Sequence, residues 1–227
     1  MISNVIFDCD GVLIDSEILS FAVDEKLLPD YGVSLTAAEL ARTFGGVAYG
    51  EMVLALNTRF GTSINAQRYQ EHCEAELAGM FATELRAIAG IPELLSSLRV
   101  PFALASGSDL ARLDECLSLT GLADFFEHRI FSAEQVKRGK PAPDVFLLAA
   151  ETCGWAPEQC LVIEDSPSGV VAAKAAGMRS VGFLGGAHRH TQDADILRDA
   201  GAEYVADNSV DLFGYMRDLG LVGAFRR

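Results

Sequence analysis

The residues of this chain that could do chemistry stand in four short segments, each placed after an apolar stretch. The segments are Asp8-Cys9-Asp10-Gly11, Ser106-Gly107, Lys140-Pro141 and Glu164-Asp165-Ser166. If the segments meet, their four carboxylates cannot all stay ionised and unpaired, so we expect a divalent cation among them. The donors are oxygens without a His or Cys cluster, which favours Mg²⁺ or Ca²⁺ over Zn²⁺. Mg²⁺ suits the set best if phosphate oxygens complete its shell.

A hydroxyl, backbone N–H groups and a lysine would lie beside that cation. Ser106 and Gly107 precede a predicted helix, so their N–H groups offer a cradle for an anion. Lys140 adds a positive charge to the same place. A magnesium ion, N–H donors and a lysine around one pocket describe a site for a phosphoryl group on a small substrate.

Asp8 and Asp10 can divide the work at that phosphoryl group. Alternate side chains of an extended segment point to the same side, so Asp8 and Asp10 face together and Cys9 faces away. A carboxylate held on the metal can attack phosphorus, as in aspartyl-phosphate enzymes. The second carboxylate can give and take a proton at the leaving group.

The elements that must position these segments follow from the apolar pattern. Strands are predicted at residues 4–8, 101–106, 129–131, 160–164, 180–184 and 203–206. Helices are predicted at 109–119, 143–153, 168–176 and 211–219. This alternation favours a parallel sheet covered on both faces, which binds ligands beyond the carboxyl ends of its strands.

A helical block interrupts the alternation after the first strand. From about Ser16 to Ala87 the apolar residues follow helical periodicity, without a convincing strand. We therefore predict an α/β protein: a three-layer, Rossmann-like parallel sheet core with an inserted all-α cap domain. The core would comprise residues 1–15 and 88–227, and the cap residues 16–87.

Composition and charge limit the partners. The chain has 227 residues, half of them hydrophobic, and a net charge of −14, which disfavours nucleic acid and anionic membranes as partners. Its apolar runs are too short for a membrane span, and its start lacks the basic residues of a signal peptide. Five scattered cysteines without a C-x-x-C pair are typical of reduced cytoplasmic thiols. We expect a cytoplasmic protein that is a monomer or a weak dimer.

Four motifs resemble, in order, those of the haloacid dehalogenase-like hydrolase superfamily. They are Asp8 to Ser16, Ser106, Gly139 to Asp144, and Glu164-Asp165-Ser166. The second Asp of the first motif is typical of phosphoryl-transfer members rather than dehalogenases. The helical insertion is similar to the cap of the β-phosphoglucomutase and phosphatase subgroup.

That resemblance implies roles for individual residues. Asp8 would be the nucleophile and Asp10 the general acid and base. Mg²⁺ would be bound by Asp8, the Asp10 carbonyl and Asp165, with Glu164 in support. Ser106 and Lys140 would hold the transferring phosphoryl group, together with Gly107.

The cap leaves two activities to weigh, a phosphatase and a sugar-phosphate mutase. β-Phosphoglucomutases carry a histidine where this chain has Ser20, and an arginine where it has Tyr49. Both differences favour the phosphatase, because the second phosphate would lose a bidentate partner. Cap segments 44–47, 74–81 and 84–88 are similar to those of bacterial phosphatases acting on 6-phosphogluconate. We expect a magnesium-dependent phosphatase acting on a sugar phosphate or sugar-acid phosphate, with the mutase as the alternative.

Two regions stay open at this point. Ser20, Gly46 and Tyr49 are candidates for specificity, but Tyr49 could equally pack inside the cap. The segment containing His188 and His190 is interpreted as a mobile loop without a role at the substrate, in preference to a metal site.

Overall fold

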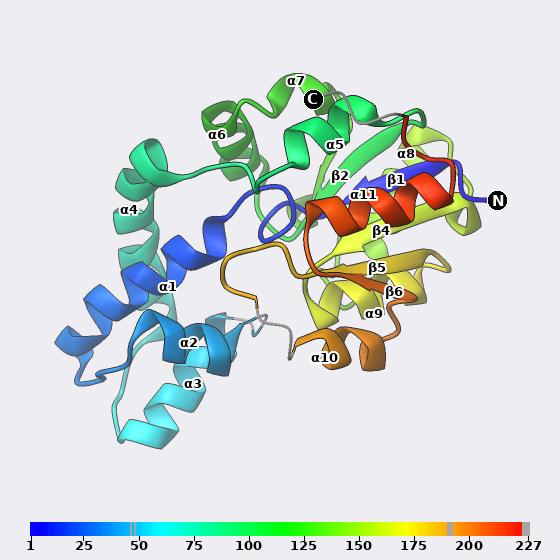
Figure 1. The fold of residues 1–227 in the computed structure, drawn as a ribbon. Helices are drawn as coiled ribbons and strands as arrows, with labels where there is room; N and C mark the ends of the chain where they lie inside the picture. The colour runs from blue at the N-terminus through cyan, green and yellow to red at the C-terminus, as the bar shows by residue number, and fades with distance from the viewer. Residues whose placement is uncertain (46, 48, 190–192, 224–227) are drawn as a thin grey trace.

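The computed structural model describes residues 1–45, 47, 49–189 and 193–223. Six parallel strands form one sheet in the order β3-β2-β1-β4-β5-β6 (Figure 1). The strands are β1 (Asn4–Phe7), β2 (Phe102–Ser106), β3 (Ile130–Ser132), β4 (Cys160–Glu164), β5 (Arg179–Phe183) and β6 (Tyr204–Ala206). All six predicted strands are present, and the fifth lies one residue earlier than expected.

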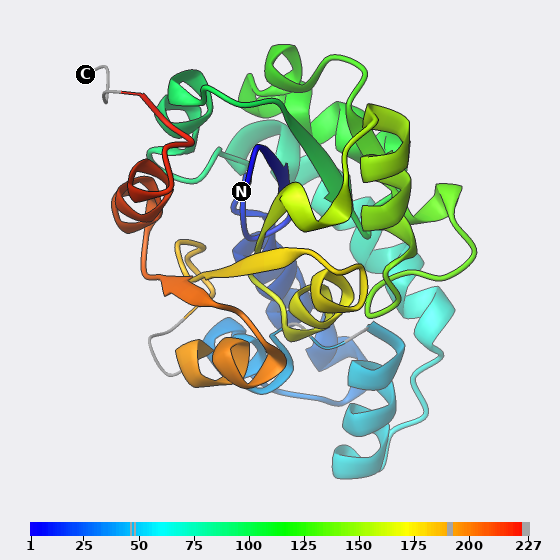
Figure 2. The same ribbon diagram turned by 90° about the vertical axis from the view of Figure 1, so that its right-hand side faces the viewer.

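The sheet is covered by helices on both faces. Val5 and Phe7 of β1 share a buried apolar cluster with α5 (Ile91–Ser97), α6 (Leu110–Thr120) and α11 (Ser209–Asp218). Ile6 points to the opposite face, where the cluster includes α8 (Asp144–Cys153) and α9 (Pro167–Ala175). Figure 2 shows α11 and α8 on opposite sides of the sheet. This three-layer parallel arrangement is the predicted Rossmann-like core.

The segment after β1 is helical, as its periodicity predicts. It contains α1 (Ser16–Leu27), a 3₁₀ turn (Leu28–Tyr31), α2 (Ala37–Phe44), α3 (Tyr49–Phe60) and α4 (Ala66–Glu84). Thr36 and Glu39 form a capping box at the start of α2, and the Asn65 side chain caps α4. In Figure 1 these four helices lie to one side of the sheet. The domain limits at residues 15/16 and 87/88 stay a prediction.

Several short elements were not predicted. They are α5, α7 (Ala123–Phe126), α10 (Asp193–Ala200) and the 3₁₀ turns Ala133–Gln135 and Pro157–Gln159. Each spans eight residues or fewer, too few for a clear helical period. Within the described residues, none of the helices combines the length and apolar character needed to cross a bilayer.

Candidate active site

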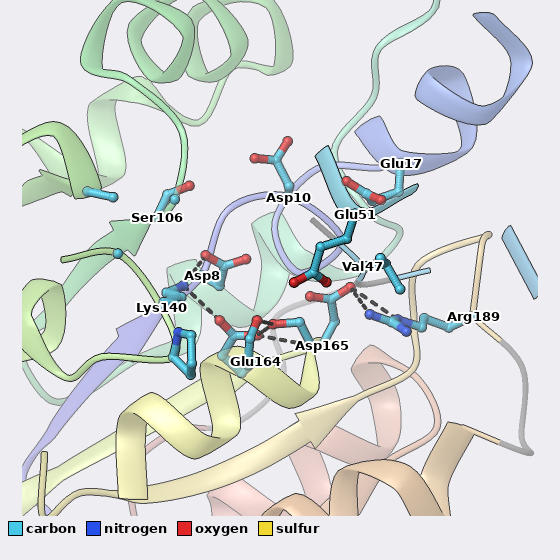
Figure 3. A pocket seen from close by; sticks show the side chains of 16 residues that line it. Asp8, Asp10, Glu17, Val47, Glu51, Ser106, Lys140, Glu164, Asp165 and Arg189 are labelled. Atoms are coloured by element: carbon cyan, nitrogen blue, oxygen red, sulfur yellow. Dashed lines mark hydrogen bonds and ion pairs between the residues drawn. The ribbon is translucent and has the colours of Figure 1, made fainter. Parts of the chain in front are cut away.

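Seven residues predicted for the site line one cavity. It lies at the carboxyl ends of β1, β2 and β4, has a volume of about 690 Å³ and is shown in Figure 3. The seven are Asp8, Asp10, Ser106, Gly107, Lys140, Glu164 and Asp165. Parallel strands place their carboxyl ends at one edge, which explains why segments distant in the sequence meet here.

Lys140 binds the two carboxylates at the bottom of the cavity. Its Nζ donates to Asp8 Oδ1 at 2.6 Å, to Glu164 Oε1 at 2.7 Å and to the Ala105 carbonyl at 3.1 Å. The Lys140 side chain is 9 % exposed, and although burial lowers its pKa, Asp8 and Glu164 outweigh this and raise it. Lys140 is therefore a fixed positive charge beside Asp8.

The Glu164 side chain is held by hydrogen bonds from the turn that follows it. Its Oε2 accepts from the Ser166 backbone N–H at 2.9 Å and from the Ser166 hydroxyl at 2.8 Å. Gly169 lies so close that a Cβ there would stand 1.7 Å from Glu164 Oε1. The Ser166 side chain also caps helix α9 by accepting from the Gly169 backbone N–H.

Three buried carboxylates fit a divalent cation. One oxygen each from Asp8, Glu164 and Asp165 lies within 4.8 Å of the others. Burial, and then the negative charges of Glu164 and Asp165, raise the pKa of Asp8 well above its usual value, although the charge of Lys140 acts to lower it. An all-oxygen donor set whose charge is not balanced by Lys140 alone suits Mg²⁺.

Asp10 is held by a different set of partners. Its carboxylate accepts from the Ser16 hydroxyl, from Ser108 Oγ at 2.7 Å and from Arg112 at 3.2 Å. Burial would raise the pKa of Asp10, but the Arg112 charge and these hydrogen bonds outweigh it and lower the pKa. In Figure 3 the Asp10 side chain points away from Lys140. Asp8 and Asp10 therefore occupy different electrostatic environments, as two different roles require.

Ser106 and Gly107 end β2 at the cavity wall. Ser106 is buried, and its Oγ accepts from the Ser108 backbone N–H at 3.1 Å. A Cβ on Gly107 would meet no atom within 4 Å, so this backbone faces open space in the cavity. The turn therefore leaves room for an anion beside its N–H groups.

His188, which the sequence analysis assigns to a mobile loop without a role at the substrate, lies beside the acidic cluster. Its ring is buried, and Nε2 lies 3.1 Å from Asp165 Oδ2. Arg189 donates to the same oxygen from Nε at 3.2 Å and from its terminal nitrogen at 3.1 Å. Gly11, with φ +76°, allows this approach, because a Cβ there would lie 2.2 Å from Asp165 Oδ2. His190 lies outside the described residues.

Ser20 and Tyr49 line a second, smaller cavity of about 130 Å³, which shares Glu17 and Val47 with the larger one. Ser20 Oγ donates to the Ser16 carbonyl at 3.2 Å. Tyr49 donates to Asp24 Oδ1 at 3.0 Å and stacks on Tyr69, which donates to the same oxygen at 2.8 Å. Tyr49 is thus part of a hydrogen-bonded cluster inside the cap. Gly46 lies outside the described residues.

We expect Tyr49→Phe to destabilise the fold rather than change substrate choice. The buried Asp24 carboxylate would lose one donor, which costs about 1–3 kcal/mol of unfolding free energy. Chemical denaturation measures this, with Tyr31→Phe as control, because the Tyr31 hydroxyl has only an exposed contact with His72. Unchanged stability together with a raised KM would instead assign Tyr49 to the substrate.

Three charged residues that line the cavity were not named as site residues from the sequence: Glu17 on α1, Glu51 on α3 and Arg189. Arg189 follows the glycine pair Gly185-Gly186 after β5, so the strand-end rule could have found it. Nothing in the sequence pattern indicates that the side chains of Glu17 and Glu51 face the cavity of the α/β domain. Burial first, and then Asp10, raise the pKa of Glu17 to about 7.

The fold and this strand-end site define the class of the protein. The family model of haloacid dehalogenase-like hydrolases matches residues 2–177, and the chain belongs to that family of enzymes. Its curated relatives include several phosphatases.

Individual relatives show how far the similarity extends. The chain is 34% identical over 201 residues to the phosphorylated carbohydrates phosphatase of Thermotoga maritima, covering 87% of this chain and 91% of that protein. It is 28% identical over 187 residues to 6-phosphogluconate phosphatase of Escherichia coli K12, covering 82% and 85%. A haloacid dehalogenase-like protein of unknown function from Agrobacterium tumefaciens superposes with a TM-score of 0.90 at 35% identity, covering 97% of this chain and all of that one.

Proposed function

We propose that this enzyme is a magnesium-dependent phosphatase that hydrolyses a small sugar phosphate or sugar-acid phosphate through an aspartyl-phosphate intermediate. The observation that carries the proposal is the contact of Asp8 with Lys140 beside Glu164 and Asp165, in a cavity that Asp10 also lines. Relatives named as phosphatases of phosphorylated carbohydrates support the substrate class. We propose that it acts in the cytoplasm, as a monomer or weak dimer.

The two aspartates would carry the chemistry. An Asp8 oxygen attacks phosphorus, the bond from phosphorus to the leaving oxygen breaks, and Asp10 gives that oxygen a proton. Water then attacks the aspartyl phosphate, Asp10 takes its proton, and the bond to Asp8 breaks to release phosphate. The negative charge of the incoming phosphate offsets the effect of the Arg112 charge on Asp10. It therefore raises the pKa of Asp10 and favours its protonated form.

Asp8, Asp165 and the Asp10 carbonyl would hold Mg²⁺, with Glu164 in support. When bound, the ion supplies positive charge that offsets the charge of the phosphoryl group. Lys140, already placed 2.6 Å from Asp8, would contact the phosphoryl group from the other side, while Ser106 and Gly107 would donate hydrogen bonds.

The mutase remains the less favoured alternative. A mutase must hold a second phosphate in its cap, and Ser20 and Tyr49 offer no positive charge there. The Tyr49 hydroxyl is moreover already bound to Asp24. Phosphate release from a panel of sugar phosphates and sugar acids tests the proposal; conversion of β-glucose 1-phosphate to glucose 6-phosphate without phosphate release would favour the mutase.

Activity should depend on Mg²⁺ and be inhibited by Ca²⁺. Ca²⁺ accepts more ligands at longer distances and can engage both Asp8 oxygens, which removes the nucleophile. Dialysis against a chelator should abolish phosphate release and Mg²⁺ should restore it, whereas Ca²⁺ should compete with that recovery. Full activity in excess chelator would rule out the metal.

His188 should support metal binding through Asp165. We expect His188→Leu to weaken Mg²⁺ binding about 10–100-fold, because loss of a residue that orients a metal ligand typically lowers metal affinity by that factor. Titration calorimetry on the metal-free protein measures the affinity without relying on activity. His188→Gln, which keeps a donor, should lose less, and exposed His128→Ala should lose nothing. A folded His188→Leu variant with unchanged affinity would contradict this role.

A further inference from the structure

The cavity wall that faces away from Lys140 determines which leaving groups the enzyme can accept, if the enzyme is the phosphatase proposed above. The cation site and Lys140 occupy the bottom, so the leaving group of a bound phosphate ester must lie against the remaining wall. That wall includes Glu17, Val47, Glu51 and Arg189. In Figure 3 the carboxylates of Glu17 and Glu51 lie to the right of Asp8, whereas Lys140 lies to its left.

The two glutamates are available to a ligand. Neither Glu17 nor Glu51 has a hydrogen bond or an ion pair within 4 Å to any of the described residues, in contrast to Asp8, Asp10, Glu164 and Asp165. Glu51 is exposed and Glu17 is half-buried, so both carboxylates can meet a substrate. The negative charge of the two carboxylates would therefore act directly on any charged group of the leaving group.

Among the described residues that line the cavity, none from residues 16–87 carries a positive charge. Among the described residues lining the cavity, the basic ones are Lys140 and Arg189, both outside residues 16–87. Arg189 makes two hydrogen bonds to Asp165, and its side chain is only 6 % exposed. The sequence of residues 44–51, from the last residue of α2 into the first turn of α3, contains no Lys, Arg or His.

We propose that this cavity selects phosphate monoesters whose leaving group is rich in hydroxyls and carries no negative charge. Carboxylate oxygens accept hydrogen bonds from hydroxyls, which orients a polyol or neutral sugar. A leaving group with a carboxylate or a second phosphate would instead face Glu17 and Glu51, and like charges at close range repel. Arg189, the one cation among the described residues of that wall, is already hydrogen-bonded to Asp165. The charge of the wall thus narrows the substrate to neutral sugar and polyol phosphates.

Matched substrates test this directly. Glucose 6-phosphate and 6-phosphogluconate differ at carbon 1, where the second carries a carboxylate, and nitrophenyl phosphate reports the core chemistry alone. At a pH well above 7, where Glu17 is ionised, we expect kcat/KM for the neutral sugar to exceed that for the sugar acid at least about tenfold. Added salt should narrow the gap through screening. A preference for 6-phosphogluconate overturns the inference.

Two variants assign the effect to its residues. Glu51→Gln and Glu17→Gln should each raise the acid-to-neutral ratio of kcat/KM several-fold, whereas Glu74→Gln, an exposed cap control on α4, should leave the ratio unchanged. An unchanged ratio in both test variants also overturns the inference. If nitrophenyl phosphate is not hydrolysed in Mg²⁺ by the unmodified enzyme, it is the phosphatase function that fails.

Discussion

Asp8→Asn is expected to reduce phosphate release by at least about 10⁴-fold, because an amide cannot attack phosphorus in place of a carboxylate. The loss should be equal for nitrophenyl phosphate and for sugar phosphates, since both need the same nucleophile. Steady-state phosphate release measures it.

The fold should survive this substitution. The pKa of Asp8 is raised, mainly by burial, so its ionised form destabilises the metal-free protein, and an amide removes that charge while still accepting from Lys140. We expect an unfolding temperature without Mg²⁺ equal to or above that of the unmodified protein. Clear turnover by a folded Asp8→Asn enzyme would refute the assignment of the nucleophile.

Asp10→Asn should slow turnover of sugar phosphates by about 10²–10⁴-fold, the usual contribution of a positioned acid or base. The amide can keep its contacts with Ser16 and Ser108, so the variant changes proton transfer more than structure. Single-turnover rates of leaving-group release isolate the first step.

The size of that first-step loss should depend on the leaving group. Nitrophenolate leaves without a proton, so its release should slow far less than that of a sugar. Arg112→Lys is a useful companion, because it keeps a charge near Asp10 but loses the planar guanidinium. An equal first-step loss for both substrates would show that Asp10 does not protonate the leaving group.

The sheet could be predicted because its strands are short, apolar and separated by clear turns. β1, β2 and β4 carry buried residues at nearly every position, which only a strand covered on both faces tolerates. The short helices α5, α7 and α10 could not be predicted, because tertiary packing rather than a repeating pattern stabilises them.

The core site could be predicted because strand ends converge by topology alone. Asp8, Lys140 and Glu164 belong to three segments, and the sheet brings them within hydrogen-bonding distance. The contact of His188 with Asp165 could not be predicted, because the glycine-rich surroundings of His188 indicate a loop, whereas its ring packs against Asp165 in the space left by Gly11. Contacts between the cap and the core depend on side-chain direction, which no local sequence pattern encodes.

The most direct test of the account is to trap the phosphoryl group on the enzyme. Asp10→Asn enzyme mixed with nitrophenyl phosphate and Mg²⁺, quenched in acid within one turnover and analysed by peptide mass spectrometry, should carry one phosphoryl group on Asp8. The same mixture with Asp8→Asn enzyme should carry none. A burst of nitrophenolate with no phosphoryl group on the peptide containing Asp8, or one on another residue, would contradict the account.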